Sequence, residues 1–340
     1  RLVNRMARAA IGLAQDTGRE HPVCVSLGKV ADAVRSTLET SDGDLSAHLE
    51  ELDALIEERD QSIQADAQPY VQLVLGHEAS EASRSVAQAW LVEAISHTSE
   101  PAIRRFLSEY WLRVMQSAHL DGGTTGTRWT ECNVTSKELV WSVQPRQSAE
   151  ERKQLLSLIP SLIRRINAGL DLLPIPAEER TPFLNACFDL QTAALRTRSD
   201  VPGVPAQPSA QAQTAPVALS NSSVMAEPSD QTLERNGIRV HYLGRPAETP
   251  SPWRSGASTR SEGDWISFHL PDEQILCGRH CGQASSTGTV LMYNSDWGYA
   301  VALAPSMLEQ QLRAGRARIV SESALFDEAA ERALGQIAPR

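Results

Sequence analysis

The stretch that decides the fold is residues 265–303, WISFHLPDEQILCGRHCGQASSTGTVLMYNSDWGYAVAL. Apolar and polar residues alternate along its first part, as at Ile266, Phe268 and Leu270, and short polar turns separate the apolar runs. This pattern predicts an antiparallel meander whose strands lie at 265–270, 275–277, 290–293 and 299–303, with a further strand at 238–242. Short strands joined this tightly favour a small closed antiparallel β-barrel.

Helical patterns follow the meander. Ser306 and Glu309 predict a capping box for a helix that stops at Gly315. The apolar residues of 326–337 have helical spacing and predict a final amphipathic helix. Residues 233–340 are therefore expected to form the barrel together with its terminal helices.

Residues 1–197 have the pattern of an all-α domain. The apolar positions within 45–63 recur mostly at steps of three and four residues, which is the spacing of one helix face. Ser148 and Glu151 predict a capping box at the start of a later helix, in which Pro160 predicts a kink or a break. The fold class expected for the whole chain is α+β, with a helical domain, a linker and the small barrel.

Two further features concern the ends of the helical domain. The chain begins at Arg1 inside an apparent helix, so we expect additional residues upstream of it. Residues 198–232 are rich in Pro, Ala, Gln and Ser and have no periodicity, which is typical of a flexible linker. The prolines within 201–226 exclude that long uncharged stretch as a membrane span.

Composition narrows the classes of function. The 340 residues carry a formal net charge of −10, which argues against nucleic-acid binding driven by bulk charge. The acidity lies on the helical part, because residues 1–195 hold 19 basic and 27 acidic side chains whereas 233–340 hold 11 and 12. Only Lys29, Lys137 and Lys153 are lysines. The five cysteines are odd in number and mostly isolated, which indicates a reducing cytoplasm.

Several segments together resemble the proteobacterial family of domains of unknown function 1631. In the helical part these are Phe106, Leu107 and Trp111, LVWSVQP at 139–145, EER at 150–152 and LIPSL at 158–162. In the C-terminal part they are GDWI at 263–266, Gly288, Leu291, Asn294 and LRAGRAR at 312–318. The resemblance implies a cytoplasmic bacterial protein with a helical body, a terminal barrel and no established activity. Some automatic labels for such proteins read thymidine phosphorylase, but the sequence shows no phosphate-cradling loop after a strand.

The expected barrel is similar in outline to PilZ domains, and this resemblance implies binding of cyclic di-GMP. PilZ domains use an Arg-x-x-x-Arg arm and an Asp/Asn-x-Ser-x-x-Gly turn. Here Arg254 and Arg260 are six residues apart, and the turn at 294–298, NSDWG, is one residue short. The module is therefore degenerate, with Arg254, Arg260 and Arg279 as candidate grips for a phosphate group.

A second candidate surface lies near the end of the chain. It combines Arg313, Arg316 and Arg318 with the aromatic pair Trp297 and Tyr299. Such a surface suits a protein partner or a nucleic acid. The alternative is that the arginines compensate the dipole at a helix C-terminus, and nucleic acid is not the expected partner.

An enzyme that processes nucleosides or nucleotides is the competing class. It would need a pocket in the helical body at which Arg104, Arg105, Glu109 and His119 converge. The glycine-rich segment 121–127 follows a helix and lacks a following Lys-Ser or Lys-Thr, so we expect an interhelical loop there.

Cys277, His280 and Cys281, with His269 one strand away, are the candidate zinc ligands. Their C-x-x-H-C spacing is not a standard ligand pair and no second pair accompanies it, so strand packing is expected. Trp111 and Trp141 are expected to pack in the helical core.

These observations favour a non-enzymatic cytoplasmic regulatory or adaptor protein. Its helical body would contact a protein partner, and its PilZ-like barrel would be tethered by the linker. No catalytic residue, metal or cofactor is expected, and no membrane association. Cyclic di-GMP is the candidate small ligand, although its motif is incomplete.

Overall fold

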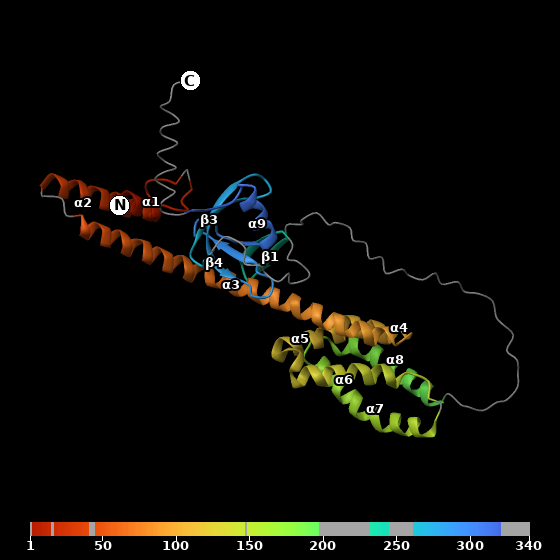
Figure 1. Cartoon of the computed structure of the whole chain (residues 1–340). Coiled ribbons are helices and arrows are strands. Elements are labelled where there is room, and N and C mark those ends of the chain that lie inside the picture. The colour runs from red at the N-terminus through yellow and green to blue at the C-terminus, as the bar shows by residue number, and fades with distance from the viewer. Residues whose placement is uncertain are drawn as a thin grey trace. The chain divides into compact units, whose positions relative to one another are not determined.

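The computed structural model of the chain describes residues 2–14, 17–40, 45–146, 148–196, 231–244 and 261–320 (Figure 1). The chain forms two compact units. Unit 1 contains Arg1–Glu78 and Ser223–Arg340, and unit 2 contains Ala79–Ser222. The boundary falls within helix α3 (Ser46–Ser96). Residues 1–78 thus belong to the same compact unit as the C-terminal strands. That residues 1–197 fold as a separate helical domain stays a prediction.

Unit 1 is built on one mixed sheet. Its seven described strands are β1 (Gln231–Arg235), β2 (Ile238–Leu243), β3 (Trp265–His269), β4 (Ile275–Gln283), β5 (Val290–Tyr293), β6 (Ala300–Leu303) and β7 (Arg318–Val320). Their order is β1-β2-β6-β5-β4-β3-β7, and only the β2–β6 pair is parallel. The α+β class is confirmed. The closed antiparallel barrel is wrong, because β1 and β7 are the two edges of an open sheet among the described strands.

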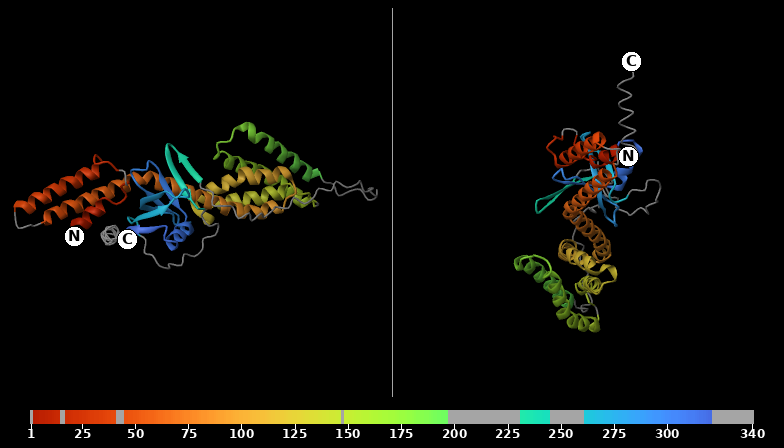
Figure 2. Two further views of the ribbon diagram at one scale, coloured as in Figure 1. Left: turned by 90° about the horizontal axis from the view of Figure 1, so that it is seen from above. Right: turned by 90° about the vertical axis from the view of Figure 1, so that its left-hand side faces the viewer.

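Helices cover both faces of this sheet, which explains why it does not need to close. One face packs against α3, and Figure 2 shows the strands beside the middle of that helix. The contacts join Trp265, Leu291, Tyr293 and Ala302 of the sheet to Ile63, Ala67 and Val74 of α3. On the other face, Phe268, Met292, Val301 and Leu303 pack against Leu308. Every residue of β5 and β6 is consequently buried, as strands covered on both sides require.

The helix that covers the second face is α9 (Pro305–Arg313). The predicted capping box of Ser306 and Glu309 is wrong, because the helix begins at Pro305 and its N-cap is Ala304, whose side chain makes no cap hydrogen bond. The predicted stop is confirmed: Gly315 follows the helix with φ +69°, a conformation that glycine adopts readily. The helix predicted over 326–337 lies outside the described residues.

The N-terminal part of unit 1 is helical. It contains α1 (Leu2–Ala9), α2 (Pro22–Thr40) and the first part of α3, which confirms the helix expected over 45–63. Val30, Val34 and Leu52 form a small core between these helices.

The described residues of unit 2 form helices and the turns that join them. After the end of α3 it contains α4 (Pro101–Phe106), the π-helix η1 (Leu107–Trp111), α5 (Leu112–Gly122), the short 3₁₀ turn η2 (Gly123–Thr125), α6 (Thr127–Ser142), α7 (Ala149–Leu170) and α8 (Ala177–Arg196). The capping box of Ser148 and Glu151 is confirmed, and α7 continues across Pro160 without a break. Within the described segments, no helix is long and apolar enough to span a membrane.

Candidate functional site

Arg279 is the one predicted phosphate grip that lies in the described part of the chain, since Arg254 and Arg260 lie outside it. It stands on β4 and only 12% of its side chain is exposed. Its Nη1 donates a hydrogen bond to Oε1 of Gln64 at 2.8 Å, and its Nε lies 3.5 Å from Oδ1 of Asp60. The guanidinium therefore already has two partners on α3.

The Arg279 side chain lines a cleft of about 390 Å³ between α1, α3 and β4. The charged residues of this cleft are Arg5, Arg8, Arg279, Asp53, Glu57 and Asp60. Arg5 pairs with Asp53, with 3.0 Å between Nε and Oδ1. Three guanidinium groups thus face three carboxylates, so the cleft has no excess positive charge with which to select an anion.

Other polar contacts fasten α3 to the same face of the sheet. The Thr289 hydroxyl donates to Oε1 of the buried Glu78 at 2.8 Å, and the Gln64 amide donates to the Cys281 carbonyl at 2.9 Å. The rings of Tyr70 and Tyr293 lie 5.0 Å apart. Satisfied polar groups within an apolar interface specify how the helix docks on the sheet.

The turn at 294–298 is also used internally. Asn294 is 1% exposed, and its amide donates to the carbonyl of Gly12 at 2.7 Å and to that of Cys277 at 2.9 Å. Gly12 has φ +84°, and a Cβ there would lie 2.2 Å from the Trp265 ring. His21 Nε2 lies 3.4 Å from Oδ1 of Asp296. The turn at 294–298 therefore contacts Gly12 and His21 of the N-terminal segment and holds them beside the sheet.

In the second predicted surface, two of the arginines form ion pairs with nearby glutamates of the same chain. Arg313 pairs with Glu309 at 3.0 Å, and Arg316 donates to both carboxylate oxygens of Glu273 at 2.8 Å. Trp297 stacks on Tyr299 with 5.8 Å between ring centroids. Both rings are half-buried beside the apolar face that packs on α9, while Arg318 is exposed on β7. Two of the three arginines thus have acidic neighbours that lower the local positive charge.

The residues proposed for a nucleotide enzyme do not converge. Arg105 and Glu109 form an exposed pair, with 2.9 Å between Nε and Oε2, and this pairing raises the pKa of Arg105. His119 Nδ1 lies 2.9 Å from the hydroxyl of Ser83, and Arg104 is exposed. The glycine-rich segment joins α5 to α6, which confirms the interhelical loop.

The candidate zinc ligands are separated by their own contacts. His280 Nδ1 lies 3.1 Å from the Ser261 carbonyl, and His269 Nδ1 contacts the carbonyl of Arg316. A bulge between His280 and Gly282 interrupts β4 there. The described residues contain no group of three His, Cys, Asp or Glu side chains that could hold a metal ion.

Burial makes the strand thiols weak acids, which gives a first testable prediction. It raises the pKa of Cys277 and of Cys281 from 9.0 to about 11. In the unfolded chain these thiols ionise first, so the free energy of unfolding should fall as the pH rises from 9.0 to about 11. At pH 8, alkylation of the buried Cys281 by iodoacetamide should be about tenfold slower than that of the half-buried Cys24. Equal rates, measured by mass spectrometry of peptides, would contradict this assignment.

Asp60 and Gln64 are the site residues that sequence reasoning missed. Asp60 belongs to an acidic run that reads as a solvated helix face, and Gln64 carries no motif. The available signal was their spacing of four residues, which places both on one side of α3 next to Ile63 and Ala67.

A family model matches part of the chain. Residues 74–186 match the family model described as protein of unknown function (DUF1631), third domain. The match supports the resemblance to this family, and the matched segment includes α4 to α7 and part of α8. No curated protein and no solved structure matches the chain.

Proposed function

We propose that this chain, which carries a segment matching a DUF1631 third domain, is a non-enzymatic regulatory or adaptor protein that acts through protein contacts. The proposal depends on one observation: two side chains that were candidates for ligand recognition make their hydrogen bonds to other parts of the same chain. Arg279 and Asn294 both fasten helical or loop segments of the chain to the sheet. Groups committed to internal docking suit a scaffold better than an open catalytic site.

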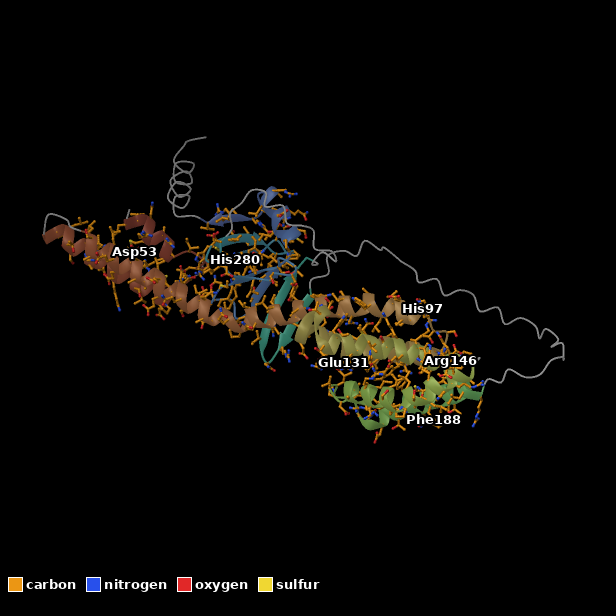
Figure 3. All side chains as sticks on the ribbon, turned by 60° about the horizontal axis from the view of Figure 1, so that its bottom comes forward. Asp53, His97, Glu131, Arg146, Phe188 and His280 are labelled. Carbon is orange, nitrogen blue, oxygen red and sulfur yellow. The ribbon has the colours of Figure 1, made fainter. Side chains whose placement is uncertain are left out.

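Unit 2 offers a surface for the partner on α8. Phe188 is 61% exposed there and is labelled in Figure 3. The half-buried Leu184 and Leu195 lie four residues before it and seven after it, so the three side chains share one face of the helix. An exposed aromatic side chain flanked by apolar neighbours is typical of a binding hot spot.

The test is a titration with a purified partner. Proteins captured by the whole chain from extracts of its source cells are identified, purified and titrated by calorimetry. We expect Phe188→Asp to weaken one such complex by about tenfold or more. Leu156→Asp changes another exposed apolar residue, on α7, and serves as the matched control. Turnover of a metabolite by the purified chain, with no partner that titrates, would overturn the proposal.

A more specific form of the regulatory hypothesis is that the chain binds cyclic di-GMP through Arg254, Arg260 and Arg279. It requires Arg279 to exchange Asp60 and Gln64 for a phosphate group. We therefore expect calorimetry with cyclic di-GMP to show no heat at high micromolar ligand. Heat that disappears in Arg279→Leu would instead make the chain a ligand sensor.

A further inference from the structure

A groove in unit 2 lies outside every site considered above. It runs between α6 and α7 and has a volume of about 560 Å³. One wall comes from residues four apart on α6, Lys137 and Trp141. The other wall comes from Gln154, Ser157, Leu158 and Ser161, which recur on one face of α7. The groove therefore combines one aromatic ring with a small set of polar groups, as ligand sites commonly do.

The aromatic wall of the groove, Trp141, is held in place by Arg146. Trp141 was expected in the core, but it is half-buried and lines the groove. The guanidinium carbon of Arg146 lies 3.8 Å from the centroid of the indole ring. Arg146, labelled in Figure 3, is itself buried and donates to the carbonyl of Trp141. A cation–π contact with a buried arginine fixes the ring before any ligand arrives, which lowers the entropy lost on binding.

The charge of the groove comes from Lys137. Its neighbour Glu138, which also lines the groove, pairs with Arg165 of α7. Lys137 is exposed and has no ion pair with any described residue. One positive charge is thus left at the groove, and it lies one helical turn from the indole ring.

The hydrogen-bonding groups point to the same kind of ligand. The hydroxyls of Ser157 and Ser161 already donate to the carbonyls of Gln154 and Leu158, each at 2.8 Å. The donors left to a ligand are therefore the Lys137 ammonium, the Gln154 amide and the indole N–H of Trp141, none of which donates to another described residue. Leu158 and Trp141 supply the apolar contact. We propose that this groove binds a small molecule in which a planar ring carries an anionic group, either a phosphate or a carboxylate.

The test uses the full chain labelled with 5-fluorotryptophan and observed by fluorine NMR. The Trp141 signal is assigned by its loss in Trp141→Phe, and the remaining six of the seven tryptophans report whether the fold is kept. Phenyl phosphate and benzoate are the probes. We expect at least one of them to shift the Trp141 signal saturably, with a Kd of about 1 mM for a ligand of this size. The tighter probe identifies the anionic group.

Two controls separate a built site from weak general attraction. Inorganic phosphate and phenol, which are the two halves of the first probe, should each bind at least about fivefold more weakly. Lys137→Gln should weaken binding of the probe by about tenfold. Lys153→Gln removes an exposed charge of α7 outside the groove and should leave the affinity for the probe unchanged. The proposal is overturned if neither probe shifts Trp141 up to about 10 mM, or if both lysine variants act equally.

Discussion

Replacing Trp111 with alanine is expected to lower the free energy of unfolding of unit 2 by about 3–5 kcal/mol, the usual cost of deleting a large buried aromatic side chain. Trp111 is 1% exposed at the end of the π-helix, where its ring packs against Phe106. Its indole N–H donates to the carbonyl of Cys132 at 3.2 Å. A Cβ on Gly169 would lie 2.8 Å from this ring, so α7 approaches it as closely as glycine permits.

The measurement is hydrogen exchange followed by mass spectrometry in increasing guanidinium chloride, read on peptides of α5 to α7. Exchange resolved by peptide is needed because two compact units need not unfold together. Trp90→Ala is the matched control, since that tryptophan is 42% exposed and should cost less than half as much. Equal losses in the two variants would mean that Trp111 is not a centre of the core.

The strands show what local pattern can and cannot predict. The alternation at Ile266 and Phe268 placed β3 correctly, and the apolar run at 290–293 placed β5. The closed barrel failed because those same apolar runs are buried on both faces by α3 and α9. Nothing in the period of a strand says which distant helix will cover it. The edge strand β1 was missed because its sequence, QTLER, is largely polar, and β7 was missed because it has only three residues.

The candidate site shows the same limit at the level of single residues. Arg279 was selected for its guanidinium, which suits phosphate, but it contacts Gln64, 215 residues away in the chain. Asp60 reads as one member of an acidic surface until the fold brings it beside β4. Asn294 was recognised as part of a turn, whereas its contact with Gly12 depends on where the N-terminal loop lies. The residue types indicated which hydrogen bonds and ion pairs these side chains can form, but not which distant residues of the chain they contact.

The pairing of Arg279 leads to the second large expected effect. Arg279→Leu should destabilise unit 1 by about 2–3 kcal/mol, because breaking a buried ion pair leaves its partner poorly solvated. The value lies below the usual range for fully buried pairs because the Asp60 side chain is 26% exposed and keeps part of its hydration. Hydrogen exchange on peptides of α3 before residue 78 and of β4 measures the loss.

Arg316→Leu provides the matched control for this arginine. Arg316 makes two hydrogen bonds to Glu273, yet both side chains are well exposed, so the change should cost about 0–1 kcal/mol. Adding Asp60→Asn to Arg279→Leu should recover part of the stability, because the carboxylate left without its guanidinium is then neutral. If Arg279→Leu costs no more than Arg316→Leu, Arg279 does not fasten α3 to the sheet. Its guanidinium would then be available to a ligand, and the sensor hypothesis would gain over the adaptor.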